Sequence, residues 1–380
     1  MKVCVLTAVH QPFDGRIFHR QSTALAQAGH EVTLVAPADF ERQERDGVTV
    51  LGVPLPTSRW QRPLVWWRLG RHARRLRPDV VHFHDPELLL LAAALKLTVA
   101  RRTHFFYDVH EYLVDSVREK TWLPSWFRPL AAWSVQRLER LLALSVSGLV
   151  CVIKDQLELY QKLRCPKVII HNYPAAADFA GAQPPPEYGP EDEFRLVYIG
   201  GLFERRGVWT MLQAFHIVAQ RIPNARLFLG GNYEDPAFKE RVERFIAAHD
   251  LPVTLLGWVP FARVKDYLTY AHCAWMPGLL TIQFSNRALS TKIFEAMICG
   301  VPIVSADLPN RREFIEPSGA GLFVTPDDPT SHADAILWLY QHPKEQEALG
   351  ARGKAWVAEK YTWEQESKVL LHFYEQFSRN

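Results

Sequence analysis

The sequence has little cysteine and no apolar run long enough to cross a membrane. Its five cysteines are scattered and form no CxxC pair: Cys4, Cys151, Cys165, Cys273 and Cys299. This usage is typical of reduced, buried thiols in a cytoplasmic protein and argues against a disulfide framework. The longest apolar runs, 88–95 and 141–153, are shorter than the roughly 18 to 20 residues that span a bilayer. Met1 and Lys2 lead directly into a strand-like run without a cleavage site, so we expect no signal peptide.

Several well-known catalytic signatures are also missing. The sequence has no G-x-S-x-G elbow, no Walker A loop and no zincin helix. Of its 380 residues, 48% are apolar and 22% are charged, a composition that excludes collagen, coiled coil and wholesale disorder. A chain of this length and composition is expected to fold into two or three globular domains.

Charge is unevenly distributed along the chain. Residues 1–175 carry 24 Lys and Arg against 16 Asp and Glu, whereas the remainder carries 20 against 25. Basic residues alternate with tryptophan in 59–77 and 118–140, a pattern that suits an anionic membrane surface. A solvated helix face with a few tryptophans turned into the core explains the same pattern. Because no nucleic-acid-binding motif accompanies the charge, we expect no nucleic-acid partner.

Short β-branched runs alternate with amphipathic stretches over most of the chain. In the first half, strands are expected at 2–8, 31–35, 48–53, 80–83, 104–108, 148–153 and 167–171, and helices at 16–28, 64–76, 87–97, 130–144 and 156–163. In the second half, strands are expected at 194–199, 226–229, 253–256, 274–277, 302–305 and 321–324, and helices at 208–221, 237–249, 261–270, 291–298 and 331–340. Such alternation predicts an α/β fold with parallel sheets covered on both faces.

The alternation is interrupted by a segment rich in proline and acidic residues. Residues 174–193 are typical of a linker. The sequence therefore predicts one domain over 1–173 and a second over 194–361. Ligands of such sheets bind outside the carboxyl ends of the strands, so two facing domains would form a cleft between them.

The segment 285–302 combines a polar loop with the start of a helix. The helix is expected to begin at Ser290 or Thr291, where free N–H groups favour a diphosphate. Lys292 adds a cation in the first turn, and Glu295 lies one turn further on the same side. A carboxylate at that position can accept both hydroxyls of a ribose. An ordinary capped helix with an exposed lysine and glutamate is the alternative.

A second candidate segment, 198–207, follows the first strand of the second half. Gly200 and Gly201 allow backbone to approach a ligand closely, and Arg205 and Arg206 can hold phosphate oxygens. The segment is not G-x-G-x-x-G and no acidic residue follows at the spacing of a dinucleotide site, so a dehydrogenase is disfavoured. A turn with exposed arginines remains the alternative.

Polar side chains also follow the strands of the first half. Asp14, Gly15 and Arg16 form a turn after the first strand. Two later strands end in paired histidines and acids: His82, His84 and Asp85, then Asp108, His110 and Glu111. A histidine beside an acid can orient a substrate hydroxyl or share its proton. Buried structural histidines and a metal site are the alternatives, and the metal lacks a third ligand in the sequence.

Motifs along the whole chain resemble those of one known family. YDVHE, YIGGLFERRGV, LLGWVP and KIFEAMICGVPIVSAD are similar to motifs of the retaining glycosyltransferases of family 4. The resemblance implies a GT-B fold, with two facing Rossmann-like domains, parallel sheets and a central cleft. The first domain would bind the acceptor and the second a nucleotide-sugar. The terminal segment 362–380 resembles the family's last helix, which returns to the first domain.

The resemblance also implies roles for single residues. Glu295 would bind the ribose, Arg206 and Lys292 the diphosphate, and His110 would contact the transferred sugar or the acceptor; these four form the expected catalytic set. The expected donor-binding residues further include Gly15, Gly200, Gly201, Arg205, Gly257, Trp258, Asn286, Ser290 and Thr291. The expected acceptor-binding residues are Asp14, Arg16, His84, Asp85 and Glu111.

The sequence departs from the family pattern at two positions. Arg287 stands where the family often has the first acid of its E-x7-E motif. Gly201 replaces an arginine that holds phosphate. Asn286, Ser290, Lys292 and Glu295 match a variant seen in a polysaccharide-associated branch.

The function implied is a hexosyltransferase that acts on a nucleotide-sugar, UDP-linked by default, and a glycan or lipid-linked acceptor. Cations and a helix dipole would stabilise the leaving diphosphate without a metal or cofactor. We expect a cytoplasmic protein, peripheral on the inner face of the membrane if the tryptophan and arginine clusters bind lipid. A GT-B nucleotide-sugar 2-epimerase and a non-catalytic sugar-nucleotide-binding protein are the alternatives.

Overall fold

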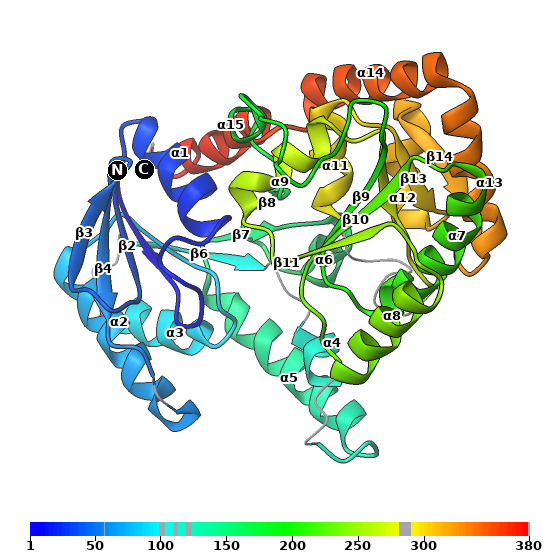
Figure 1. Cartoon of the computed structure of the whole chain (residues 1–380). Helices are drawn as coiled ribbons and strands as arrows, with labels where there is room; N and C mark the ends of the chain where they lie inside the picture. Colours follow the sequence, from blue (N-terminus) through cyan, green and yellow to red (C-terminus); the bar gives the residue numbers. More distant parts are fainter. Residues whose placement is uncertain (57, 99–102, 110–112, 119–122, 281–289, 379–380) are drawn as a thin grey trace. The chain divides into compact units, whose positions relative to one another are not determined.

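The protein divides into two compact units, each built around one sheet (Figure 1). This is a computed structural model that describes residues 1–56, 58–98, 103–109, 113–118, 123–280 and 290–378. The N-terminal unit comprises Met1–Asn172 together with Gln365–Asn380, and the C-terminal unit comprises Tyr173–Glu364.

The N-terminal sheet has eight strands in the order β3-β4-β2-β1-β5-β6-β7-β8. Their bounds are β1 (Lys2–Leu6), β2 (Glu31–Pro37), β3 (Arg42–Arg45), β4 (Val48–Val53), β5 (Val80–Phe83), β6 (His104–Val109), β7 (Gly148–Cys151) and β8 (Lys167–Ile169). All pairs are parallel except β3 with β4. The strand order reverses beside β1, where β2 and β5 flank it, and such a reversal opens a crevice at the carboxyl ends of the strands.

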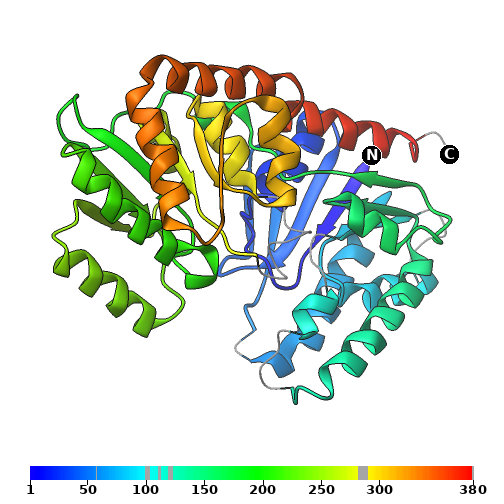
Figure 2. The ribbon, with the colours of Figure 1, turned by 90° about the vertical axis from the view of Figure 1, so that its right-hand side faces the viewer.

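Helices cover both faces of this sheet (Figures 1 and 2). The elements are η1 (Ile17–Ser22), α1 (Thr23–Gln27), η2 (Arg59–Gln61), α2 (Arg62–Leu76), α3 (Leu88–Thr98), α4 (Leu113–Arg118), α5 (Arg128–Leu142), η3 (Ala143–Ser145) and α6 (Lys154–Leu159). Strand β6 shows how the faces are divided, because Phe105 and Tyr107 join the core under α2 and α3. Phe106, between them, packs instead on Phe373 and Tyr374 of α15 (Trp363–Glu375).

The C-terminal sheet has six parallel strands in the order β11-β10-β9-β12-β13-β14. Their bounds are β9 (Phe194–Ile199), β10 (Ala225–Gly230), β11 (Val253–Gly257), β12 (Cys273–Met276), β13 (Ile303–Ala306) and β14 (Gly321–Val324). The order reverses at β9, which lies between β10 and β12. The carboxyl ends of β9 and β12 therefore flank the crevice in which ligands of such sheets bind.

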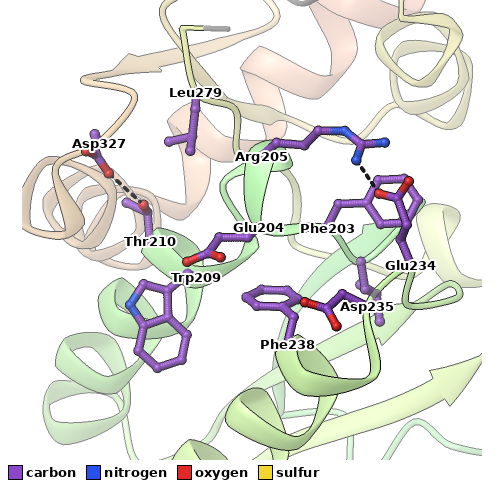
Figure 3. A pocket seen from close by; sticks show the side chains of 11 residues that line it. Phe203, Glu204, Arg205, Trp209, Thr210, Glu234, Asp235, Phe238, Leu279 and Asp327 are labelled. Atoms are coloured by element: carbon purple, nitrogen blue, oxygen red, sulfur yellow. Dashed lines mark hydrogen bonds and ion pairs between the residues drawn. The ribbon is translucent and has the colours of Figure 1, made fainter. Parts of the chain in front are cut away.

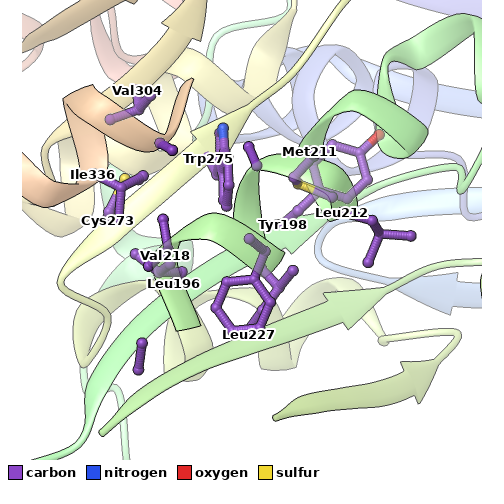
Figure 4. Packing of buried hydrophobic residues seen from close by; sticks show 14 of the residues in the cluster. Leu196, Tyr198, Met211, Leu212, Val218, Leu227, Cys273, Trp275, Val304 and Ile336 are labelled. Carbon is purple, nitrogen blue, oxygen red and sulfur yellow. The ribbon is translucent and has the colours of Figure 1, made fainter. Parts of the chain in front are cut away.

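Two separate cores cover the faces of this sheet. The helical elements are η4 (Ala176–Phe179), η5 (Glu204–Arg206), α7 (Val208–Arg221), α8 (Pro236–Ala248), α9 (Phe261–Thr269), α11 (Thr291–Cys299), α12 (Pro309–Ser318), α13 (Pro329–Gln341) and α14 (Pro343–Lys360). Leu196 and Tyr198 face a cluster that includes Met211 of α7 and Ile336 of α13 (Figure 4). Val197 faces the opposite cluster, formed with α9 and α11. This alternation along β9 is that of a strand buried on both faces.

The structure differs from the expected elements in several places, since strand β3 and helices α4, α12 and α14 were not predicted by the hydrophobic pattern. Strand β3 is exposed at all four residues and pairs antiparallel at the sheet edge, so it has no apolar signal. The expected helix 16–28 is divided into the π-helix η1 and the α-helix α1. The expected linker carries buried side chains, since the Tyr188 hydroxyl donates to the Tyr267 carbonyl and its ring packs on Phe228.

Candidate functional site

The carboxyl ends of β9 and β12 bring Gly200 and Lys292 together in the C-terminal unit. A Cβ atom at Gly200 would lie 2.7 Å from Lys292 Cε and 3.3 Å from its Nζ. The lysine stem therefore occupies the space that the missing side chain leaves. Lys292 is half-buried in the first turn of α11, so its ammonium group is held at the crevice and not in bulk solvent.

Lys292, Arg206 and Arg311 are three cations of this crevice whose charges affect one another. Burial lowers the pKa of Lys292, and the charges of Arg206 and Arg311 lower it further, whereas Glu295 opposes the shift. Burial also lowers the pKa of Arg311 to about 10, with a contribution from Arg206 and an opposing one from Tyr198. Like charges at close range are costly. Their convergence therefore creates a positive potential that an anion such as a diphosphate would satisfy.

Helix α11 supplies further polar groups to the same region. Ser290 is its N-cap residue, and the Ser290 side chain makes no capping hydrogen bond with any described residue. Thr291 opens the helix, and Glu295 lies half-buried one turn later. The partial positive charge of a helix N-terminus favours an anion, and a carboxylate one turn away can accept hydroxyl groups.

The turn after β9 carries both expected arginines. Arg205 is exposed, pairs with Glu234 and lies 4.6 Å from the Phe203 ring centroid. Arg206 is half-buried and hydrogen-bonds the Tyr198 hydroxyl. Gly207 closes the turn at φ +77°, a conformation that favours glycine. Arg206 also lies over the Phe203 ring, at 5.0 Å from its centroid, but its charge, unlike that of Arg205, lowers the pKa of Lys292.

Two cavities lie beside these strand ends. One, of about 610 Å³, is lined in part by Gly231, Asn232, Tyr233 and Gly257 at the ends of β10 and β11. Gly257 has φ +64°, and the neighbouring Trp258 is 67% exposed. The predicted base-binding residues Gly257 and Trp258 thus lie at an open edge of the sheet.

The second cavity, of about 580 Å³, lies under the Arg205 turn (Figure 3). Phe203, Trp209 and Phe238 line it together with several carboxylates. Those carboxylates have partners, such as Arg205 for Glu234 and Thr210 for Asp327 (Figure 3). The Arg241 guanidinium lies 3.7 Å from the Trp209 ring centroid.

In the N-terminal unit, the turn after β1 carries Gly15, predicted to bind the donor, and Asp14 and Arg16, predicted to bind the acceptor. Gly15 is exposed with open space around it, and Asp14 Oδ1 accepts from the backbone N–H groups of Arg16 and Ile17. Arg16 is buried, and its Nε and Nη2 donate to Asp108 over 3.1 and 3.0 Å. The structure therefore places the Arg16 guanidinium inside a buried ion pair.

Around Asp108 the structure assembles a buried polar cluster. His82, His84 and Asp108 offer ligand atoms within 4.8 Å of one another, the arrangement of a three-residue metal site. Asp108 already accepts from Arg16 and from Gln21 Nε2, so a cation balances its charge. The cluster is therefore better explained as a structural ion pair than as a metal centre, because the Arg16 guanidinium would repel a metal cation bound beside it.

Asp85 forms a second buried group at the ends of β1 and β5. Its Oδ2 accepts the Ala8 N–H and its Oδ1 lies 3.5 Å from His10 Nε2. Burial raises the pKa of the Asp85 carboxyl, while Ala8, His10 and His84 oppose the shift. His10 is partly exposed, so this pair presents an imidazole at the carboxyl edge of the sheet.

Three expected site residues, His110, Glu111 and Asn286, lie outside the described residues, as does Arg287, the departure from the family pattern. The structure also shows residues that sequence reasoning missed. Tyr198, Arg311 and His10 each interact with an expected site residue. Arg311 had no sequence signal, since it stands among polar residues at the start of a helix. Tyr198 had a weak signal, because it is the one polar ring in an apolar strand.

The two Rossmann-like units with parallel sheets define the class of the protein, and comparison with known proteins gives its family. Residues 15–174 match the model described as "Glycosyl transferase 4-like domain" and residues 193–342 match "Glycosyl transferases group 1". Together the two models match most of the chain. The chain therefore belongs to the glycosyltransferases of the family 4 type, as the sequence motifs predicted, and it is a glycosyltransferase.

Individual relatives are similar over nearly the whole chain. The phosphatidyl-myo-inositol mannosyltransferase of Mycolicibacterium smegmatis is 25% identical, over 93% of this chain and 87% of the relative. The solved sucrose-phosphate synthase of Thermosynechococcus elongatus has a TM-score of 0.72 at 18% identity, over 99% and 98% of the two chains. Anabaena HepE in complex with UDP-glucose has a TM-score of 0.71 at 14% identity, over the full length of both chains. These structures confirm the GT-B fold prediction.

Within the described part of the chain, no helix is both long and apolar enough to cross a bilayer.

Proposed function

We propose that this protein transfers a sugar from a nucleoside-diphosphate sugar to a hydroxyl of a glycan or lipid-linked acceptor, with retention of anomeric configuration. One observation carries the proposal: Arg206, Lys292 and Arg311 converge near the N-terminus of α11, one turn from Glu295. A leaving diphosphate develops negative charge in the transition state, and preorganised cations stabilise it most strongly.

The residues of the C-terminal unit then have distinct roles. Arg206 and Lys292 hold the diphosphate, and the α11 N-terminus adds its dipole. Glu295 accepts the ribose hydroxyls, and Gly257 and Trp258 contact the base. Acceptor binding is assigned to the strand ends of the N-terminal unit, where Asp85 and His10 are placed. No metal is required in this scheme, because the protein supplies the positive charge itself.

The donor is proposed to be UDP-linked, with a GDP-linked sugar as the second choice. The solved HepE complex contains UDP-glucose, whereas one relative is a GDP-mannose-dependent mannosyltransferase. A thermal-shift panel of UDP-, GDP- and ADP-sugars distinguishes the bases, because a ligand that binds only the folded state raises the melting temperature.

Substitution of Glu295 tests the proposed role of the crevice. Glu295→Ala should lower sugar transfer by about a hundredfold or more, since it removes charge-assisted hydrogen bonds to the ribose. Glu313→Ala is the matched control, an exposed glutamate of α12 in the same unit. Transfer by the Glu295→Ala protein at the wild-type rate, with folding intact, would remove the assignment. Turnover of a nucleotide-sugar without any acceptor would indicate an epimerase instead.

We further propose that one face of the N-terminal unit binds an anionic membrane surface, which would place the protein at the inner face of a cytoplasmic membrane. Helices α2 and α5 both pack against α3 on one side of the sheet. Helices α2 and α5 with the residues that lead into them, named here the α2–α5 face, expose four tryptophans: Trp60 (93%), Trp67 (59%), Trp126 (79%) and Trp133 (54%). Arginines accompany the rings, with Arg71 over Trp67 at 5.6 Å and Arg137 over Trp133 at 4.9 Å.

The charge of the α2–α5 face supports lipid as its partner. Helix α2 contains no acidic residue, and the one acid of α5, Glu139, is buried and accepts from the Tyr107 hydroxyl. The neighbouring Glu87 pairs with Arg62 and accepts from Trp66 Nε1 of α2. The exposed Trp67 and Trp133 are instead accompanied by Arg71 and Arg137, and exposed rings beside arginines match the headgroup region of an anionic bilayer. A glycosyltransferase held there could reach a lipid-linked acceptor.

A further inference from the structure

Arg311 is a buried arginine in the first turn of α12, and the roles proposed above assign it charge in the cation cluster but no contact with the ligand. It is 7% exposed, and its guanidinium donates to three acceptors at the ends of two strands. Nη1 donates to the Met276 carbonyl and to Ser305 Oγ, and Nη2 donates to the Pro277 carbonyl over 2.9 Å. Arg311 therefore joins the end of β12 to β13.

The charge of Arg311 has no acidic partner among the described residues. Its neighbour Arg312 differs in this respect, because it pairs with Asp307 and Glu316 at the surface. A buried cation without an acid is costly, since backbone carbonyls compensate only part of the lost hydration. Proteins keep a buried charge at this cost in free energy where the charge serves a functional site.

The environment of Arg311 indicates what that use is. The charge of Arg311 lowers the pKa of Lys292, and the charge of Arg206 lowers that of Arg311. Both neighbours belong to the proposed diphosphate site. A dianion bound to Arg206 and Lys292 would thus also reduce the electrostatic cost of the buried Arg311.

Arg311 is also linked to Arg206 through the backbone. A Cβ atom at Gly278 would lie 2.8 Å from Arg311 Nη2, so Gly278 leaves room for the guanidinium. On the other side, a Cβ atom at Gly207 would lie 2.7 Å from the Gly278 nitrogen. The turn that carries Arg206 therefore packs against the backbone of Gly278, and the Arg311 guanidinium contacts that backbone from the other side.

We infer that Arg311 is a positioning residue for the diphosphate site: it fixes the end of β12 under the Arg206 turn and adds buried positive charge beside Lys292. The inference rests on the proposed function, because it requires a diphosphate ligand. It goes beyond that function by giving a role to a residue that contacts the ligand only through others.

The test compares the affinity for UDP, or for whichever nucleotide the panel selects, among four full-length proteins. Arg311→Met removes both the charge and the grip on the carbonyls, and should weaken binding about tenfold or more. Arg311→Lys keeps the charge but cannot donate to both carbonyls in the same geometry, so it should weaken binding less. Arg312→Met, on the same helix, is the matched control and should bind as the wild type does.

The pH dependence separates positioning from a merely structural role. Among the residues that the structure describes, the charged and titratable groups near Lys292 are Glu295, Arg206, Arg311 and Tyr198. Nucleotide affinity should fall as the pH rises through the pKa of Lys292 in the free protein. Arg311→Met should move this fall to higher pH, because a repelling charge is removed, and Arg311→Lys should leave it in place. Ionisation of the nucleotide itself is common to all four proteins.

Each outcome decides the inference. Weaker binding together with the shifted alkaline fall supports it. Wild-type affinity and an unshifted fall in both Arg311 variants would overturn it while leaving the proposed function intact. If Arg311→Met does not fold, Arg311→Lys decides alone: wild-type affinity overturns the inference, and weaker binding with an unmoved alkaline fall supports it. Failure of the wild type to bind any nucleotide would instead overturn the proposed function, and the inference with it.

Discussion

The Lys292 side chain lies across the backbone of Gly200, so that a Cβ atom on the glycine would be 2.7 Å from Lys292 Cε. The two residues are 92 positions apart in the sequence, yet the Lys292 side chain fits in its observed position only because Gly200 has no side chain. Gly200 ends the strand segment that opens the crevice, and Lys292 crosses it to join the cation cluster.

Gly200→Ala should displace Lys292 and weaken nucleotide binding by about three- to tenfold, because one charge-assisted contact is lost. The free energy of unfolding should change by no more than about 1 kcal/mol, since the atom displaced is near the end of a flexible side chain. The readouts are titration calorimetry with the selected nucleotide and urea denaturation. In the background of Lys292→Met, Gly200→Ala should have no further effect on affinity. Additive losses in this double-mutant cycle would show that the glycine acts independently of the lysine.

Asp108→Asn should strongly destabilise the N-terminal unit. It would leave the buried Arg16 guanidinium without its carboxylate, and removal of one partner of a buried ion pair costs about 3 to 5 kcal/mol. Urea denaturation of the full chain, followed by tryptophan fluorescence, measures the loss. Asp39→Asn changes an exposed carboxylate of the same unit and serves as the control. Equal stability of the two variants would contradict the importance of the Arg16–Asp108 pair.

His332 should make the C-terminal unit sensitive to acid. It is fully buried and accepts from Trp275 Nε1 over 3.1 Å, and burial lowers the pKa of His332 to about 4. Since the unfolded chain takes up a proton near pH 6.5, stability should be complete above that value and fall as the pH drops toward 4, by about 3 kcal/mol. Denaturant midpoints across this range measure the loss. His332→Gln should remove this contribution, and an unchanged slope would show that other groups cause it.

The α2–α5 face should bind vesicles that contain anionic lipid. Co-sedimentation at low salt should weaken about tenfold or more for the double variant Trp67→Ala with Trp133→Ala, because two exposed rings leave the interface. Added salt should weaken binding as well, since the arginines act through screened charges. Trp258→Ala removes an exposed tryptophan of the other unit and is the control. Absence of wild-type binding at low salt would remove the membrane proposal without affecting the proposed reaction.

Much of the fold was predictable because the strands are buried on both faces. Strands such as Val48–Val53 and Val80–Phe83 have the bounds that their apolar runs predicted. Strand β3 was missed because its four exposed polar residues follow no apolar pattern. The linker-like composition of 174–193 was evident from the sequence, but its packing was not, since nothing in the segment indicated that Tyr188 would contact Phe228.

The candidate site was predictable only in part. Glycines, arginines and a helix start at strand ends indicated a phosphate site, because parallel strands bring their carboxyl ends to one edge. The acids of the expected histidine and acid pairs have different partners in the structure. Asp108 forms an ion pair with Arg16, whereas Asp85 lies beside His10. Neither partner could be identified from spacing, since each lies more than 70 positions away.

By itself the sequence determined the local properties: which segments are strands or helices, where cations and glycines occur, and to which family the chain belongs. The tertiary structure alone decided which charges meet. Arg311 looks like a solvated helix residue in the sequence, and burial beside Lys292 gives it a role. The physical reason is that hydrophobic periodicity acts over a few neighbouring residues, whereas Coulomb energy and desolvation depend on distances and burial that only the folded chain sets.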